Sequence, residues 1–136
     1  MDPLIGIELA IYRLQSAEER LKAARLLLER QMYSDGVSRA YYAVFQAARA
    51  VLATKSLDSR KHSGIIGLFN QQFVKTGILS RDYGKILKSC RDLREVGDYD
   101  DFYLVSREEA FSSIENASRF IRGIKLYLKT YEDDIP

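Results

Sequence analysis

The chain has 136 residues, enough for one domain with a buried hydrophobic core. Hydrophobic residues make up 46% and charged residues 29%, as in ordinary globular domains, and a net charge of +2 is too small to indicate nucleic-acid binding by itself. One cysteine and one histidine exclude an internal disulfide and a zinc ligand set. No signal peptide or membrane-spanning stretch is recognised, so we expect a cytoplasmic protein. No cofactor is expected.

The first predicted helix begins at Asp2 and Pro3, a capping residue followed by proline, and ends at a break over residues 34–36. Large apolar residues recur along it every seven positions, with alanines beside them. These positions are Ile7, Leu14, Leu21 and Leu28, and Ala10, Ala17 and Ala24. The pattern predicts a long amphipathic helix that a neighbouring helix can approach closely.

The second predicted helix, residues 36–54, is apolar nearly all round, which is typical of a central, buried helix. One polar stripe interrupts it, because five residues fall within an arc of about 100°. They are Ser38, Arg39, Tyr42, Gln46 and Arg49. Two interpretations stay open: the stripe is the one strip that faces solvent, or it lines a groove that binds a phosphate or a nucleotide.

The third predicted helix covers residues 62–75 and stops at Gly77, and the fourth starts after a cap at Ser80 and ends near Gly97. On the fourth helix, Arg94 falls inside the apolar arc. An arginine there keeps its charge and needs a partner or a water-filled groove. Asp98, four residues further on, is the nearest candidate partner.

An acidic and aromatic loop is expected over residues 98–103, before a fifth helix that opens with the capping box of Ser106 and Glu109. The apolar stripe of this helix is Ala110, Ile114, Ala117, Ile121, Ile124 and Leu128. Residues 132–136 are expected to fray. With no strand pattern and no repeat, we expect an all-α bundle of about five helices, forming one domain over residues 1–136.

Few of the remaining residues carry a chemical signal. His62 is the only histidine and so the obvious acid–base candidate, although a lone histidine at a helix start is often incidental. The basic stripe of Arg81, Lys85 and Lys88 is either solvated surface or a contact for phosphates. The acidic loop lacks the glycine turn and distal glutamate of a calcium loop, so no metal site is predicted.

Three stretches together resemble the HEPN domains (higher eukaryotes and prokaryotes nucleotide-binding). They are SRAYYAVFQAAR over residues 38–49, KHSG over residues 61–64 with FVKTG over residues 73–77, and Arg94 followed by Gly97, Asp98 and Tyr99. The resemblance spans roughly residues 8–128. It implies a four- to five-helix up-and-down bundle that forms a homodimer, and a minimal nucleotidyltransferase as partner in a toxin–antitoxin module.

Active members of that family are metal-independent ribonucleases whose motif is an arginine followed, after four to six residues, by a histidine. Arg94 matches the arginine, but residues 99–101 are Tyr-Asp-Asp, so ribonuclease activity is not carried over. Asp98 and Tyr99 cannot replace an imidazole, because carboxylates and phenols have ordinary pKa values near 4 and 10.

The leading hypothesis is therefore a binding protein rather than an enzyme, with nucleotide or RNA as ligand. Its expected binding residues are Ser38, Arg39, Tyr42, Gln46, Arg94, Asp98 and Tyr99. Two alternatives are a divergent endoribonuclease that uses His62 with Arg94, and a purely structural dimeric adaptor. In the adaptor, Arg39 and Tyr42 would hydrogen-bond across the dimer contact.

Overall fold

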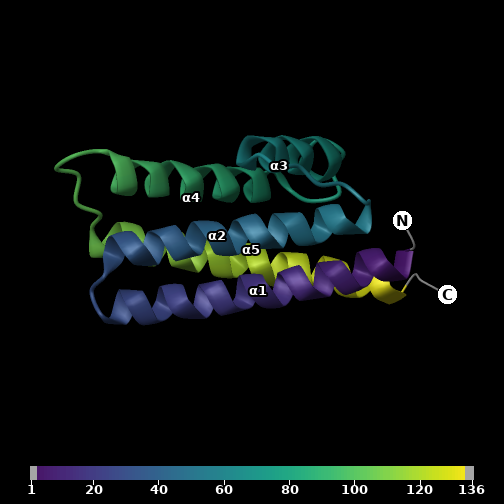
Figure 1. Cartoon of the computed structure of the whole chain (residues 1–136), viewed down its shortest axis with the longest axis horizontal. Helices are drawn as coiled ribbons and strands as arrows, with labels where there is room; N and C mark the ends of the chain where they lie inside the picture. The colour runs from purple at the N-terminus through teal and green to yellow at the C-terminus, as the bar shows by residue number, and fades with distance from the viewer. Residues whose placement is uncertain (1–2, 134–136) are drawn as a thin grey trace.

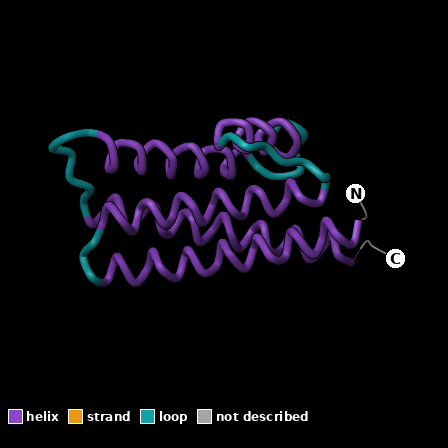
Figure 2. Tube along the Cα trace, in the orientation of Figure 1, coloured by secondary structure: helices purple, strands orange, loops and turns teal. Residues whose placement is uncertain are grey.

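The structure, a computed structural model, describes residues 3–133, and over this range every regular element is a helix (Figures 1 and 2). The elements are α1 (Pro3–Glu29), α2 (Tyr33–Thr54), α3 (His62–Phe69), a π-helical segment η1 (Asn70–Val74), α4 (Arg81–Tyr99) and α5 (Arg107–Asp133). Helices α1, α2, α4 and α5 alternate in direction, and the short α3 lies beside the start of α4 (Figure 1). The predicted all-α, up-and-down bundle is confirmed.

Helix α2 lies at the centre of the bundle, between α1 and α4, with α5 packed behind it (Figure 1). From Gly36 to Ala53, the only residues of α2 that are not buried are the five of the predicted polar stripe. The apolar stripe of α5 is buried as predicted, with each side chain at most 4% exposed. The stripe of α2 is thus the exposed strip of a buried helix, and its members contact Ser16 of α1 and Arg94 of α4.

The link between α1 and α2 differs from the expectation. Helix α1 ends at Glu29, because Gln31 adopts a left-handed φ of 61° and the amide of Met32 donates to the carbonyl of Leu27 at 2.9 Å. This arrangement ends many helices, usually with glycine at the left-handed position. Gly36 lies inside α2 instead, buried against α1, so the break predicted at residues 34–36 was wrong. The predicted cap at Asp2 lies outside the described residues.

The other helix ends follow the sequence more closely. Gly77 has a φ of 80° and ends the third helical region, although the winding widens to a π-helix after Phe69. Helix α4 extends to Tyr99, so the expected loop begins two residues later than predicted, and the hydroxyl of Ser80 makes no capping bond. The capping box is confirmed, because the amides of Ser106 and Glu109 each donate to the other's side chain at 3.0 Å.

Helix α5 continues to Asp133, past the point where fraying was expected, and residues 134–136 lie outside the described part. Between residues 3 and 133, no helix combines the length and the apolar character needed to cross a membrane.

Candidate functional site

Arg94 of α4 lies against three tyrosine rings, those of Tyr41 and Tyr42 on α2 and that of Tyr99 at the end of α4. Its guanidinium carbon lies 5.2 Å from the ring centre of Tyr42 and 5.7 Å from those of Tyr41 and Tyr99. At these distances a cation is attracted by the negative faces of the rings. The side chain is only 18% exposed, so the α2 and α4 residues hold this charge in one place.

The predicted partner of Arg94 is also present. Nε of Arg94 lies 3.1 Å from Oδ2 of Asp98, one helical turn further on, and the two form an ion pair. Nε itself is buried, and among residues 3–133 no group accepts a hydrogen bond from it. An arginine with unused donors suits the oxygens of a phosphate.

His62 reaches the same aromatic cluster from the first position of α3. Its ring stacks on Phe45 with 4.1 Å between the ring centres, and Tyr42 meets it edge-on at 5.8 Å. Nδ1 lies 3.0 Å from the hydroxyl of Tyr41. Burial raises the pKa of Tyr41 to about 12, with a smaller effect from its charged neighbours, so this phenol stays protonated.

The charge state of His62 follows from its surroundings. Partial burial lowers its pKa below the ordinary value, and the positive charges of Arg94 and Arg49 lower it further. The imidazole is therefore neutral at pH 7. When Nδ1 carries the proton and donates to Tyr41, Nε2 is left as a basic atom.

A hollow of about 520 Å³ opens beside the cluster, on the same outer strip of α2. Three of the predicted binding residues line it, together with Leu27 of α1 and Asp35. The three are Ser38, Arg39 and Tyr42. Tyr42 belongs to both features, since its ring also contacts Arg94. The hollow and the guanidinium of Arg94 therefore both adjoin the Tyr42 side chain.

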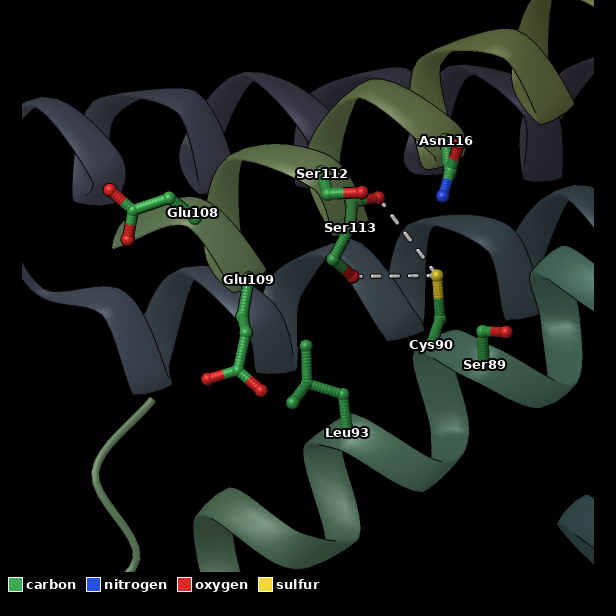
Figure 3. Close-up of a pocket in the computed structure, with 8 residues that line it drawn as sticks. All are labelled: Ser89, Cys90, Leu93, Glu108, Glu109, Ser112, Ser113 and Asn116. Carbon is green, nitrogen blue, oxygen red and sulfur yellow. Dashed lines mark hydrogen bonds between the residues drawn. The ribbon is translucent and has the colours of Figure 1, made fainter. Parts of the chain in front are cut away.

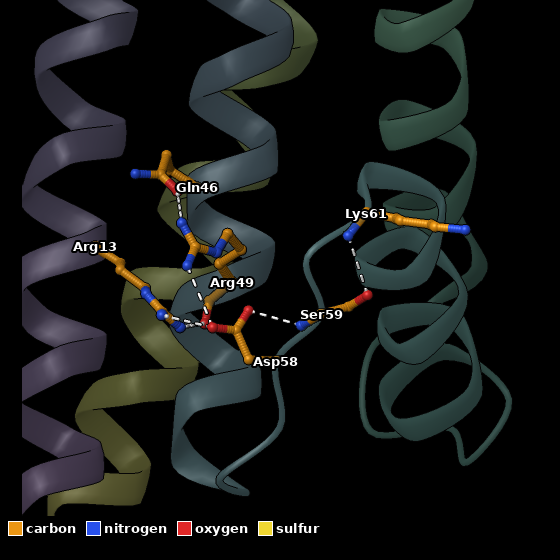
Figure 4. Close-up of polar contacts among 6 residues, drawn as sticks. All are labelled: Arg13, Gln46, Arg49, Asp58, Ser59 and Lys61. Atoms are coloured by element: carbon orange, nitrogen blue, oxygen red, sulfur yellow. Dashed lines mark hydrogen bonds and ion pairs between the residues drawn. The ribbon is translucent and has the colours of Figure 1, made fainter.

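Gln46 is the predicted binding residue that lies apart from Arg94. Its amide oxygen accepts a hydrogen bond from Arg49 at 3.1 Å, and its amide nitrogen donates to Ser16 on α1 at 3.3 Å. Arg49 also pairs with Asp58 at 3.4 Å, and Asp58 in turn pairs with Arg13 at 3.3 Å (Figure 4). The C-terminal members of the polar stripe, Gln46 and Arg49, therefore belong to a separate hydrogen-bonding network that links α1, α2 and the loop after α2.

Sequence reasoning missed Tyr41, Phe45, Arg13 and Asp58. Tyr41 and Phe45 follow the apolar pattern of α2, and both are buried. Arg13 is 8% exposed although its sequence neighbours give no sign of burial for a charged residue. His62 lies 32 residues before Arg94 in the chain, so no local spacing relates the two, and only the packing of α3 and α4 on α2 brings them together.

A second hollow, of about 430 Å³, lies between α4 and α5, and the buried residues Cys90 and Ser113 are among those that line it (Figure 3). The hydroxyl of Ser113 lies 3.6 Å from Sγ of Cys90. Burial raises the pKa of Cys90 to about 11, so the thiol stays protonated and is a poor nucleophile. Over the described residues, no group of three acidic, cysteine or histidine side chains is arranged to hold a metal ion.

The fold and sequence together define the class of this protein. The HEPN domain model matches residues 10–127, and the chain belongs to the HEPN domain family. A crystal structure of an archaeal HEPN homologue superposes with a TM-score of 0.62 at 19% identity, covering 88% of this chain and 97% of that one. At this identity the likeness concerns the fold alone.

Several proteins resemble this chain more closely in sequence than that structure does. A protein of Methanocaldococcus jannaschii that bears the name "Putative toxin" is 42% identical over 85% of this chain and 86% of its own length. A UPF0332 protein of Thermotoga maritima is 35% identical over 84% of this chain and 86% of its own length. A second Methanocaldococcus jannaschii protein named "Putative toxin" is 31% identical over 85% of this chain and 78% of its own length.

Proposed function

We propose that this chain is a toxin-like HEPN protein that binds RNA or a nucleotide through its phosphate at Arg94. The observation that carries the proposal is a guanidinium that lies against three aromatic rings and remains partly exposed. A charge fixed before the ligand arrives loses little side-chain entropy on binding. The adjoining hollow offers Ser38 and Arg39 for further phosphate or ribose contacts.

Fluorescence anisotropy with a labelled single-stranded RNA of about a dozen nucleotides tests this proposal, and unlabelled AMP and ATP serve as competitors. Arg94→Met keeps the side-chain length but removes the charge. We expect it to weaken binding about tenfold, which corresponds to about 1.4 kcal/mol. Arg122→Met is the matched control, because this exposed arginine lies on α5 and lines a different hollow. Equal affinities of the two variants would reject the site.

The toxin-like role and its partner rest on relatives and on the family resemblance. Two relatives carry the name "Putative toxin". We infer that this chain pairs with a minimal nucleotidyltransferase, and a gene for such an enzyme next to this one would support the pairing. Co-expression of both chains followed by size-exclusion chromatography tests it directly. Separate elution of the two proteins at micromolar concentrations would argue against a stable module.

A homodimer is also part of the proposal. The end of α4 and the loop after it expose large apolar side chains, with Tyr99 at 70%, Phe102 at 102% and Leu104 at 88% exposure. Apolar side chains gathered in this way are typical of an interaction surface. Sedimentation of the protein and of a Phe102→Ser, Leu104→Ser variant tests the dimer, which we expect the double substitution to weaken. Dissociation by Arg39→Ala with no ligand protection would instead favour the structural adaptor.

A second candidate function is metal-independent RNA cleavage, which the approach of His62 and Arg94 to one Tyr42 ring favours. His62 lies far from Arg94 in sequence, but its imidazole reaches the cluster that contains the arginine. Neutral at pH 7, it could take the proton of a ribose 2′-hydroxyl. The 2′-oxygen would then attack phosphorus and expel the 5′-oxygen, which takes a proton from the imidazolium, while Arg94 stabilises the phosphorane charge.

Incubation with RNA in the presence of EDTA tests the second candidate. We expect 2′,3′-cyclic phosphate and 5′-hydroxyl ends with the unaltered protein and none with His62→Ala or Arg94→Met. Cleavage at the same rate by all three proteins would identify a contaminating nuclease and discard the candidate. Binding without cleavage would leave the phosphate-binding function standing alone.

A further inference from the structure

In the loop between α2 and α3, residues 55–61, one carboxylate binds two arginines from neighbouring helices. Oδ2 of Asp58 accepts hydrogen bonds from Nη2 of Arg13 on α1 at 3.3 Å and from Nη2 of Arg49 on α2 at 3.4 Å (Figure 4). Its other oxygen, Oδ1, accepts from the amide of Ser59 at 2.8 Å. Asp58 thus ties the loop to two helices at once.

The carboxylate of Asp58 compensates the positive charges of both arginines. Arg13 also donates through Nη1 to the backbone carbonyl of Arg49 at 3.1 Å, so the guanidinium of Arg13 lies against α2 near a second positive charge. Burial and the charge of Arg49 lower the pKa of Arg13, and Asp58 opposes both effects. Burial alone would raise the pKa of Asp58, but hydrogen bonds from Ser59 and Arg49 bring it below the ordinary value. Asp58 is therefore ionised at neutral pH and balances a buried charge.

The same loop determines where His62 lies. Four residues after Asp58 the chain enters α3, and the first residue of that helix is His62. The turn between them is stabilised by Ser59, whose hydroxyl accepts from the amide of Lys61 at 3.3 Å. The contacts of His62 with Phe45, Tyr41 and Tyr42 all go to α2. His62 can make those contacts only if the α2–α3 loop keeps this conformation.

We propose that Asp58 is a positioning residue for His62: by joining Arg13 and Arg49 it fixes the α2–α3 loop so that the imidazole rests on Phe45. Its consequence for RNA binding or cleavage depends on the function proposed above, but the positioning itself does not. The charged and titratable groups that face His62 are Tyr41, Tyr42 and Arg49 from α2, and Arg94 from α4. Asp58 acts through the loop and through its pairing with Arg49.

Proton NMR tests the proposal without any RNA, because His62 is the only histidine and its ring signals need no separation from others. In the unaltered protein, stacking on Phe45 gives ring-current-shifted His62 signals and nuclear Overhauser effects to the phenyl protons. In Asp58→Ala we expect both to be lost, and the pKa of His62 to rise toward 6.5 as its burial is relieved. Asp58→Asn, which keeps the side-chain shape, should give a partial loss.

The matched control is Glu115→Ala, which removes a carboxylate paired with Arg25 at 3.0 Å between α5 and α1. Glu115 is about as exposed as Asp58, so both variants should remain folded, and circular dichroism verifies this. The control should keep the His62 signals unchanged. Arg13→Met removes the clamp from the α1 side and should displace His62 as Asp58→Ala does. Unchanged stacking in Asp58→Ala or in Arg13→Met would overturn the proposal.

Discussion

Replacing Arg94 by methionine tests whether the aromatic cluster holds this side chain before any ligand binds. Methionine preserves most of the apolar stem, so the change removes the charge with little loss of volume. Three ring contacts at 5.2–5.7 Å contribute about 0.5–1 kcal/mol each, and the partly exposed pair with Asp98 adds less than about 1 kcal/mol. The cost of removing the guanidinium from water offsets part of this sum.

We therefore expect Arg94→Met to lower the free energy of unfolding by about 1–2 kcal/mol, or the melting temperature by roughly 4–8 °C for a chain of this size. Urea denaturation followed by circular dichroism measures the first quantity. Arg39→Met is the control, because Arg39 is exposed and should change stability by less than about 0.5 kcal/mol.

A double-mutant cycle separates the ring contact from the loss of charge. Tyr42 is the ring nearest to Arg94, so Arg94→Met and Tyr42→Leu should be coupled by about 0.5–1 kcal/mol. Equal stabilities of the Arg94→Met and Arg39→Met variants, or a coupling energy of zero, would refute the reasoning. Arg94 would then be an ordinary surface arginine, and its geometry would carry no argument for a prearranged binding site.

Three further predictions concern His62, Cys90 and Gly123. The pKa of His62 is lower in the folded than in the unfolded state, so its stabilisation is complete above about pH 6.5 and lost as the pH falls through the folded pKa. Between pH 7.5 and 5, urea midpoints of His62→Gln should fall less than those of the unaltered protein, and parallel curves would contradict this. Iodoacetamide at pH 8 should alkylate Cys90 at least about tenfold more slowly in the folded protein than in urea, because the thiol is buried and protonated, and equal rates would show that it is accessible. A methyl group at Gly123 would overlap the phenol of Tyr83, so Gly123→Ala should cost about 1–3 kcal/mol in thermal unfolding. The smaller side chain of Tyr83→Leu should relieve that cost, and an additive double variant would exclude the clash.

The helices and several local contacts could be predicted because they depend on residues near one another in the chain. The capping bonds of Ser106 and Glu109 join positions three apart, and the pair of Arg94 and Asp98 joins positions one turn apart. The outer strip of α2 follows from the angular period of a helix alone. Each of these features was visible in the sequence for that reason.

The helix ends were harder where the chain departs from the usual residue preferences. The turn after α1 places a glutamine in the left-handed region, which most non-glycine residues avoid, while the nearby Gly36 serves packing inside α2. The π-helical winding after Phe69 has no marker in the sequence. Both depend on how neighbouring helices pack rather than on local preference.

The sequence by itself determined the helical class, the polar stripe of α2 and the arginine with its local partner. Only the tertiary structure decided what surrounds that arginine. The contact of His62 with Tyr41 joins residues 21 apart, and the pair of Arg13 and Asp58 joins residues 45 apart. Such contacts form only when α1, α2, α3 and α4 pack together, since the periodicity of one helix carries no information about the side chains of another.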